Sequence, residues 1–230
     1  MLMIKDMSAY YGESSVISGL NISVADNQIV CLIGRNGVGK STTLKSIMGL
    51  VKTPEGSIKL ADTELMKLPT YDRVKLGIGY VPQGRDIFPQ MTVQENLELG
   101  LRAAGSKEKV PDYIYDLFPI LPTFSKRNGG DLSGGQQQQL AIARALVLKP
   151  KILILDEPTE GIQPSIIEDI GAAIKKVNQE LGITVFIVEQ YLDFVLGISD
   201  YLYIMEKGNI VRHGQTDQIS ADEIRRIMTE

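Results

Sequence analysis

The chain has 230 residues, of which 43% are hydrophobic and 23% are charged, a composition ordinary for a soluble globular protein. Its net charge of −4 (24 basic against 28 acidic residues) argues against a chain whose main partner is nucleic acid, because such proteins favour a basic face. The sequence has no run near the roughly 18 apolar residues of a membrane helix and no signal-peptide core. A single cysteine, Cys31, excludes an internal disulfide and is expected only to pack.

Residues 2–31 are predicted to form short strands joined by turns, because Ile22 and Val24 alternate with polar neighbours. Tyr11 lies just before Gly12, and an aromatic ring at this point could stack on a nucleotide base. From this residue alone, a turn aromatic that packs on the sheet is the preferred interpretation.

The segment from residue 34 to residue 41, GRNGVGKS, fits the phosphate-binding pattern G-x-x-x-x-G-K-[ST]. An apolar run over 29–33 predicts a strand before it, and a helix is predicted from Ser41 to Met48. Glycines let backbone N–H groups turn toward an anion, and the helix N-terminus adds its positive dipole end. Lys40 supplies a charge for the outer phosphates, and the Ser41 hydroxyl is placed to ligate Mg²⁺. We predict a nucleotide site, since a chance glycine-rich turn does not account for this context.

Strands are predicted next over 56–60 and 78–81, with a short helix over 71–76 between them. The second strand ends at Pro82-Gln83-Gly84. A glutamine at such a point is usually a loop residue without a role. Its side-chain oxygen could nevertheless reach a metal or a water if this strand ends at the nucleotide.

The residue composition and pattern of the sequence change between residues 86 and 131. Prolines punctuate helical segments near 93–101 and 112–118, and β-branched runs are scarce. With the helix predicted after it, this region is expected to form an inserted helical subdomain at about 86–149. The rest, about 1–85 and 150–230, is expected to form the core of the same single domain.

The pentapeptide 132–136, LSGGQ, stands directly before a helix predicted from Gln137 to Leu148. Ser133 is a natural N-cap, and the paired glycines expose backbone N–H groups at a helix N-terminus. The pentapeptide therefore indicates a second anion-binding segment. Read alone, it also fits an ordinary capped helix.

A continuous apolar run over 152–155 predicts a strand buried on both faces, and it ends in Asp156 and Glu157. Two acidic residues at the carboxyl end of such a strand favour metal and water chemistry, because α/β folds bind ligands at this edge. Asp156 would belong to the Mg²⁺ shell, and Glu157 would orient or deprotonate the attacking water. Two solvated surface carboxylates are an equally acceptable interpretation of this segment alone.

The C-terminal third continues the alternation of helix and strand. A helix is predicted from Pro164 to Leu181, a buried strand over 183–188, a hairpin over 201–213 and a short helix in the last ten residues. His213, the only histidine, lies on the hairpin and is expected to be structural or solvent-facing.

In this order and spacing, the motifs closely resemble the ATP-binding subunit of ABC transporters, from about residue 2 to the C-terminus. The resemblance implies an α/β fold with a P-loop core, a parallel sheet, an N-terminal antiparallel β portion and an inserted α-helical subdomain. It implies ATP and Mg²⁺ as cofactors. The positions that match the family's ATP-binding residues are Tyr11 for the adenine and, around the phosphates, Asn36, Gly37, Gly39, Lys40, Ser41 and Thr42.

The resemblance also implies the catalytic and metal-binding positions. Glu157 is the catalytic glutamate, Gln83 matches the family's glutamine loop, and Gln190 occupies its switch position. Mg²⁺ would be held by Ser41, Gln83 and Asp156. The family's signature, which contacts the ATP of a partner, matches Ser133, Gly134, Gly135 and Gln136.

In the family, two such domains pair head to tail and trap two ATP molecules, so that Lys40 and Glu157 of one chain face Ser133 of the other. ATP binding would close the pair, and the motion would pass to membrane permease subunits near Phe88, Pro89 and Gln94. The resemblance therefore predicts a cytoplasmic protein, peripheral on the inner face of the membrane, that serves an extracytoplasmic solute-binding protein indirectly.

Two positions depart from the family pattern. The switch position usually holds histidine, but here it is Gln190, which cannot carry a charge or relay a proton. Gln163 stands where the family often has aspartate. A switch glutamine is familiar in one of the two ATPases of branched-chain amino acid importers and their relatives. We therefore expect a heterodimer over a homodimer. Within this group, the run 157–165, EPTEGIQPS, looks more like the urea-uptake branch than the leucine-uptake branch.

Two other functions are compatible with the motifs. The first is a non-transport ABC ATPase that acts on DNA or the ribosome. It is disfavoured because one phosphate loop and one signature lie only 91 residues apart (132 − 41), with no long coiled coil between them. The second is a regulatory module that dimerises around ATP without hydrolysis, against which Glu157 argues.

Overall fold

The fold is organised around a mixed sheet that is parallel except at one edge. The computed structural model describes residues 1–53, 55–103 and 105–229. Within these ranges the sheet has six strands, and β10 alone runs antiparallel to its neighbour. In spatial order they are β10 (Asn209–Gln215), β9 (Tyr201–Glu206), β3 (Ile29–Gly34), β8 (Thr184–Glu189), β7 (Ile152–Asp156) and β6 (Ile78–Val81).

A second, antiparallel sheet contains the N-terminal strands. Its strands, in spatial order across the described residues, are β2 (Ser14–Val24), β1 (Leu2–Tyr11), β4 (Glu55–Leu60) and β5 (Thr63–Glu64). The expected N-terminal antiparallel portion is therefore present. The expectation of short strands over 2–31 was wrong, because β1 and β2 form one long hairpin that turns at Gly12 and bends at register shifts near Met7.

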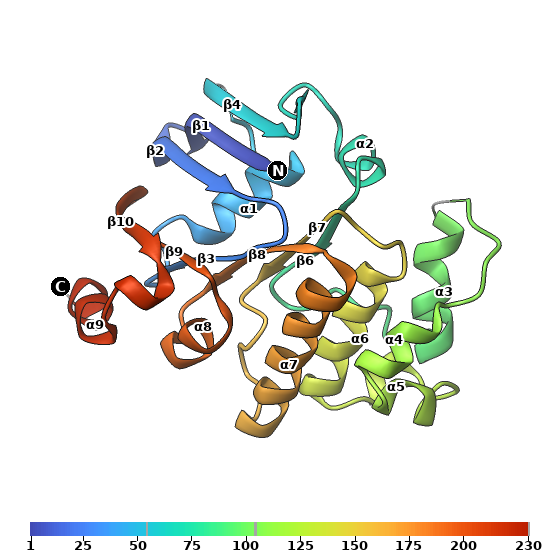
Figure 1. Cartoon of the computed structure of the whole chain (residues 1–230). Helices are drawn as coiled ribbons and strands as arrows, with labels where there is room; N and C mark the ends of the chain where they lie inside the picture. Colours follow the sequence, from blue (N-terminus) through green and yellow to red (C-terminus); the bar gives the residue numbers. More distant parts are fainter. Residues whose placement is uncertain (54, 104, 230) are drawn as a thin grey trace.

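Helices cover the mixed sheet on both faces (Figure 1). The antiparallel sheet and α1 lie on one face, whereas α6, α7 and α8 lie on the other, with α3, α4 and α5 beyond α6. The helices are α1 (Lys40–Met48), α2 (Thr70–Lys75), α3 (Val93–Ala103), α4 (Asp112–Leu117), α5 (Ile120–Thr123), α6 (Gly134–Leu146), α7 (Pro164–Leu181), α8 (Leu192–Ile198) and α9 (Ala221–Thr229), with 3-10 turns at Gly129–Asp131 and Thr216–Gln218.

The continuous apolar strands are explained by this double covering. Successive residues of β3 point to opposite faces of the sheet. On one face of β3, the side chains of Ile29, Cys31 and Ile33 pack in the core with α6, α7 and α8. On the other face, those of Val30 and Leu32 pack against α1 and the antiparallel sheet. Burial raises the pKa of the Cys31 thiol, so this side chain is kept neutral in the core, as a packing residue should be.

One predicted helix begins in a different place. The sequence indicated a helix from Gln137, but α6 begins at Gly134. Ser133 caps the helix, and the two glycines therefore form its first turn instead of preceding it. A Cβ on Gly135 would lie 2.7 Å from Ile166 Cγ2 of α7, so this glycine also permits the close approach of two helices.

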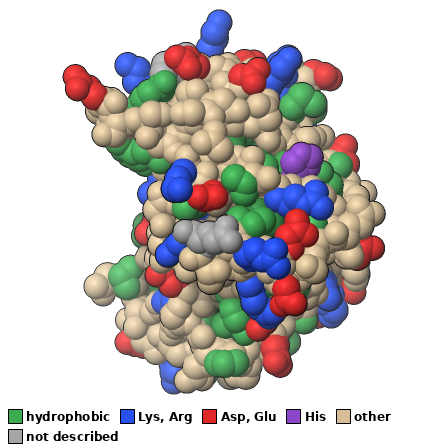
Figure 2. All heavy atoms as spheres, turned by 90° about the vertical axis from the view of Figure 1, so that its left-hand side faces the viewer, with side chains coloured by type: hydrophobic (Ala, Val, Ile, Leu, Met, Phe, Trp, Pro, Cys, Tyr) green, Lys and Arg blue, Asp and Glu red, His purple; other side chains and the backbone are tan. Residues whose placement is uncertain are grey.

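The face formed around β10 and α9 mixes charges of both signs (Figure 2). Arg212 pairs with Glu223 at 2.9 Å, and Arg225 pairs with Asp222 at 3.4 Å. His213 lies on this face, where its Nδ1 is 2.7 Å from the Tyr201 hydroxyl and its ring stacks on Tyr203. The expectation that His213 is structural or solvent-facing is confirmed.

Candidate active site

The phosphate loop connects β3 to α1 and leaves the first turn of α1 open. Gly39 is the N-cap of α1, with φ +113°, and no side chain caps the helix there. A Cβ on Gly39 would lie 3.2 Å from Met205 Cε and 3.3 Å from Ile17 Cγ1, so the backbone conformation and the close packing both require glycine. The N–H groups of this turn are therefore oriented as an anion-binding site.

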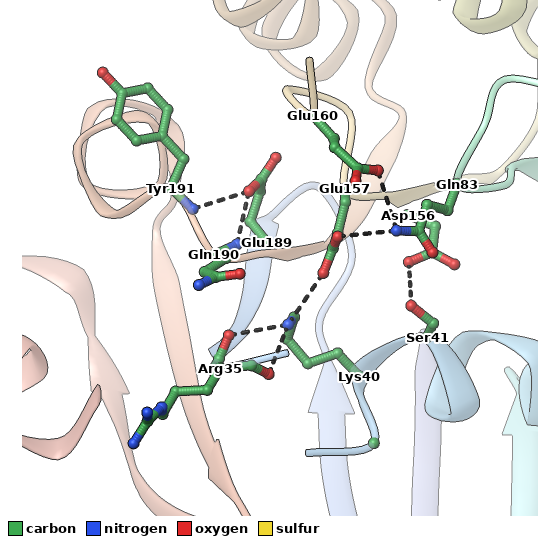
Figure 3. Close-up of polar contacts among 12 residues, drawn as sticks. Arg35, Lys40, Ser41, Gln83, Asp156, Glu157, Glu160, Glu189, Gln190 and Tyr191 are labelled. Carbon is green, nitrogen blue, oxygen red and sulfur yellow. Dashed lines mark hydrogen bonds and ion pairs between the residues drawn. The ribbon is translucent and has the colours of Figure 1, made fainter. Parts of the chain in front are cut away.

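Lys40 is the first residue of α1 and is buried, with only 4% of its surface exposed. Its Nζ donates to the carbonyl oxygens of Gly34 at 2.9 Å and Arg35 at 3.0 Å, and it forms an ion pair with Glu157 Oε1 at 3.1 Å (Figure 3). The ammonium thus has three oxygen partners. One of these partners, Glu157, is a carboxylate, the kind of anion that an ammonium binds most strongly.

Asp156 is the last residue of β7 and is almost fully buried. Its Oδ1 accepts from the Ser41 hydroxyl at 2.8 Å, and its Oδ2 lies 3.5 Å from the Tyr80 hydroxyl. Burial, followed by the negative charge of Glu157, raises the pKa of Asp156, whereas the bond from Ser41 opposes that rise. A buried carboxylate and a hydroxyl in contact are suited to a hard cation.

Glu157 occupies a strained turn immediately after β7. Its φ is +48°, in the left-handed region that residues with side chains rarely adopt, and its N–H donates to the Val188 carbonyl oxygen at 3.0 Å. Gln83 Nε2 donates to Glu157 Oε2 at 3.3 Å and to Glu160 Oε2 at 3.0 Å. The amide oxygen of Gln83 is then directed away from both carboxylates.

A cavity of about 250 Å³ brings most of the predicted residues together. The cavity is lined by the open turn of α1, the buried Lys40 ammonium and side-chain oxygen atoms. These groups fit the phosphates of a nucleotide and a Mg²⁺ ion. The Asp156 carboxylate and the Ser41 hydroxyl, which are in contact, suit Mg²⁺, which is usually held by one or two carboxylates together with substrate phosphates. The cavity is lined by Asn36, Gly37, Gly39, Lys40, Ser41, Thr42, Gln83 and Glu157.

The remaining predicted residues lie outside this lining. Tyr11, at the end of β1, is half exposed on a hairpin whose Ile17 packs against the phosphate loop. Ser133 to Gln136 lie at the N-terminus of α6, where Ser133 is exposed and Gly135 is buried. Gln190 follows β8, and its N–H donates to Glu189 Oε2 at 2.7 Å. Because β7 and β8 are parallel neighbours, Gln190 and Glu157 follow strands that end at the same edge of the sheet.

The structure adds three residues that the sequence argument missed. The Arg85 guanidinium donates to Gln137 Oε1 at 3.5 Å and to the Glu160 carbonyl oxygen at 3.2 Å, linking the segment after β6 to α6 and to the segment after β7. Glu160 binds Gln83, as described above, and Glu189 is a buried carboxylate. The adjacency of Glu189 to Gln190 was the only signal in the sequence for any of these roles.

The chain is similar to known proteins over most of its length. A model of the ABC transporter family matches residues 17–160. The high-affinity branched-chain amino acid transport ATP-binding protein BraG of Pseudomonas aeruginosa is 40% identical, covering 93% of this chain and 92% of the relative. The probable branched-chain amino acid transport ATP-binding protein LivF of Archaeoglobus fulgidus is 39% identical, covering 97% and 95% respectively. This chain belongs to the ABC transporter family.

Solved ABC structures support the same conclusion for the fold. The dimeric post-hydrolysis state of the ATP-binding cassette MJ0796, bound to ADP and Pi, matches with a TM-score of 0.83 and 27% identity, covering 94% of this chain and 99% of that one. The predicted α/β P-loop fold is therefore confirmed. As a member of the ABC transporter family, the chain is an ATPase coupled to transport, with ATP and Mg²⁺ as its cofactors. The non-transport alternative is not favoured.

Proposed function

We propose that this chain is the ATP-hydrolysing subunit of an ABC importer for a small polar solute. The observation that carries the proposal is the cavity beside the open turn of α1, which Lys40 and Glu157 line, with Asp156 bound to the lining residue Ser41. These groups supply what phosphoryl transfer to water requires: a cation for phosphate charge, a ligand for the metal and a base for the water.

In this proposal, entry of the γ-phosphate displaces Glu157 from Lys40. The freed carboxylate then orients or deprotonates the attacking water, while Lys40 stabilises the charge that develops on the phosphate oxygens. Ser41 and Asp156, with Gln83 as a third ligand, would hold Mg²⁺, which would neutralise phosphate charge. The amide of Gln190 donates a hydrogen bond toward the γ-phosphate.

A partner chain completes each site in this proposal. The N-terminus of α6 is a second anion-binding segment, but Ser133 and Gly135 are absent from the lining of the cavity among the described residues. A single phosphate meets both segments only if they come from different chains. The dimeric MJ0796 cassette with ADP and Pi supports this arrangement.

We propose a heterodimer because Gln190 replaces the family's switch histidine, which the partner chain would supply in the other site. The test is the ATPase rate of the purified chain alone, compared with the rate of the reconstituted complex. A complex that is much faster than the chain alone supports the heterodimer. A homodimer that reaches the full rate of the complex overturns it.

Membrane attachment is proposed to occur through the permease, at the helical subdomain of about 86–149. Within the described residues, every helix is too short or too polar to traverse a bilayer. Phe88 is 45% exposed beside the start of this region, and Gln94 lines a hollow of about 590 Å³ between α3 and α4. An exposed aromatic and a neighbouring hollow suit a docking helix of a permease on the cytoplasmic side.

The identity of the transported solute is the most specific part of the proposal. The run 157–165 favours urea, whereas the names of BraG and LivF favour branched-chain amino acids, our second candidate. We would measure radiolabelled urea and leucine uptake in the source cells before and after Lys40→Ala in this chain. Selective loss of urea uptake supports the urea proposal, and selective loss of leucine uptake replaces it with the second candidate. Unchanged uptake of both solutes, in cells without a redundant system, overturns the importer proposal.

A further inference from the structure

Glu189, at the carboxyl end of β8, is a buried carboxylate that has no part in the mechanism above. Its exposure is only 2%. One oxygen, Oε1, accepts from the Thr159 backbone N–H at 3.0 Å and from the Thr159 hydroxyl. The other, Oε2, accepts from the backbone N–H of Gln190 at 2.7 Å and of Tyr191 at 2.9 Å (Figure 3). Four donors thus satisfy a charge that would be costly to bury alone.

The four donors belong to two loops that carry the predicted chemistry. Thr159 lies two residues after Glu157, and Gln190 follows Glu189 directly. The turn at Glu157 is strained, with φ +48°, and a conformation of this kind persists only when its surroundings fix it. The Val188 carbonyl fixes the start of the turn by accepting from the Glu157 N–H, and Glu189 fixes the turn at Thr159.

We propose that Glu189 is a positioning residue for ATP hydrolysis. It holds the turn that carries Glu157 and the loop that carries Gln190 as one rigid unit, so that both side chains keep their places relative to a γ-phosphate. This inference rests on the proposed function, since it needs Glu157 and Gln190 to act on ATP. Glu189 itself is not among the described residues that line the cavity, and the carboxylate that pairs with Lys40 is that of Glu157.

The chemistry of the side chain makes the inference testable. An ionised carboxylate accepts hydrogen bonds at both oxygens, but an amide accepts at one end and donates at the other. In Glu189→Gln, the NH₂ group must therefore face backbone donors, either the Thr159 N–H or the N–H groups of residues 190 and 191, although the Thr159 hydroxyl can turn and accept from it. At least one backbone N–H that holds these loops loses its acceptor, although size and shape are almost unchanged.

The chain offers a matched control at Glu64. This carboxylate accepts from the backbone N–H groups of Ile58 and Met66, both at 3.1 Å, and from the Ser57 hydroxyl. Its bonds are of the same kinds as those of Glu189, but they lie within the antiparallel sheet. Glu64→Gln therefore measures what the loss of such bonds does to folding alone.

The experiment measures kcat in the reconstituted complex, and the ATP dissociation constant and Tm of the full chain, for the parent, Glu189→Gln and Glu64→Gln. Both variants should lower Tm. Only Glu189→Gln should lower kcat, by 10-fold or more, with the ATP dissociation constant within about 3-fold of the parent, because the phosphate loop is untouched. In a Glu157→Gln background, Glu189→Gln should cause no further loss of hydrolysis, since residues that act as a unit are not additive.

Thr159 gives a second route to the same answer if Glu189→Gln does not fold. Thr159→Val removes the hydroxyl bond to Glu189 and should lower kcat, whereas Thr159→Ser keeps the bond and should restore it. The inference is overturned if Glu189→Gln changes kcat no more than Glu64→Gln does, or if kcat and ATP affinity fall together. If the reconstituted complex with the parent chain hydrolyses ATP no faster than the complex with Lys40→Ala, the proposed function is overturned instead, which separates the two failures.

Discussion

Two helices of this chain begin at glycine-rich segments, and their first turns are completed in opposite ways. The N-cap of α1 is Gly39, which has no side chain to offer, and the groups nearest to this end are the charged Lys40 and Glu157. The N-cap of α6 is Ser133, whose hydroxyl accepts from the Gln136 N–H at 3.4 Å while the Gln136 side chain accepts from the Ser133 N–H at 3.0 Å.

The difference indicates what each helix end requires. The α6 end is a capping box, which satisfies the N–H groups of Ser133 and Gln136 without a ligand. The α1 end leaves its N–H groups for an anion and holds a carboxylate at the lysine in the meantime. One helix end is therefore built for ligand chemistry, and the other is stable before any partner arrives.

The largest effect is expected at the α1 end, from Glu157→Gln. Hydrolysis should fall by roughly 10²- to 10⁴-fold, because the base is lost. ATP affinity should rise, since the phosphate no longer has to displace a carboxylate from Lys40. Measurements of kcat and of the ATP dissociation constant test both parts. A variant that binds ATP more weakly than the parent would contradict the view that Glu157 competes for Lys40.

A smaller effect is expected at the α6 end, from Ser133→Ala. Loss of the cap should cost about 1 kcal/mol, which lowers Tm by roughly 2–4 °C in a chain of this size. ATP binding by the chain should stay unchanged, because Ser133 is not among the residues that line the cavity. Thermal unfolding and ATP titration measure the two quantities, and Ser133→Thr, which keeps the cap, is the control. A loss of ATP affinity would mean that the two helix ends are coupled within one chain.

The smallest effect is expected from Asp156→Asn, as a change in Tm that depends on pH. Burial raises the pKa of Asp156 in the folded chain, so the ionised form destabilises the fold increasingly as pH rises from about 4 through the folded pKa. The nucleotide-free variant should therefore unfold at a higher temperature than the parent at neutral pH, with the advantage vanishing below about pH 4. Thermal unfolding across pH tests this, and an advantage that is constant with pH would rule out the electrostatic cause. Ser133→Ala should show no such pH dependence, since its cap is neutral.

The sequence predicted the elements whose cause is local. The strand–loop–helix unit from Ile29 to Met48 follows from an apolar run, a glycine pattern and helical periodicity, all within about 20 residues. The strand that ends at Asp156 is equally local. Helix α8, Leu192–Ile198, was not predicted.

The sequence could not predict which parts of the site meet, because their proximity depends on the order of strands in the sheet. β7 lies between β6 and β8, so Gln83, Glu157 and Gln190 follow neighbouring strands although they are far apart in the chain. The signature could not be placed relative to the cavity from its pattern alone, and the structure puts it on a separate helix end.

The sequence by itself determined that this chain binds phosphate, since the glycines, Lys40 and Ser41 of one short loop supply the anion site with their own backbone and side chains. Only the tertiary structure decided how that loop is held ready. The ion pair joins Lys40 to Glu157, 117 positions away (157 − 40), and Glu189 joins Thr159, 30 positions before it, to the backbone after β8. The left-handed turn at Glu157 depends on its backbone angles. Such contacts depend on which strands are neighbours in the sheet, and a local sequence pattern does not specify that order.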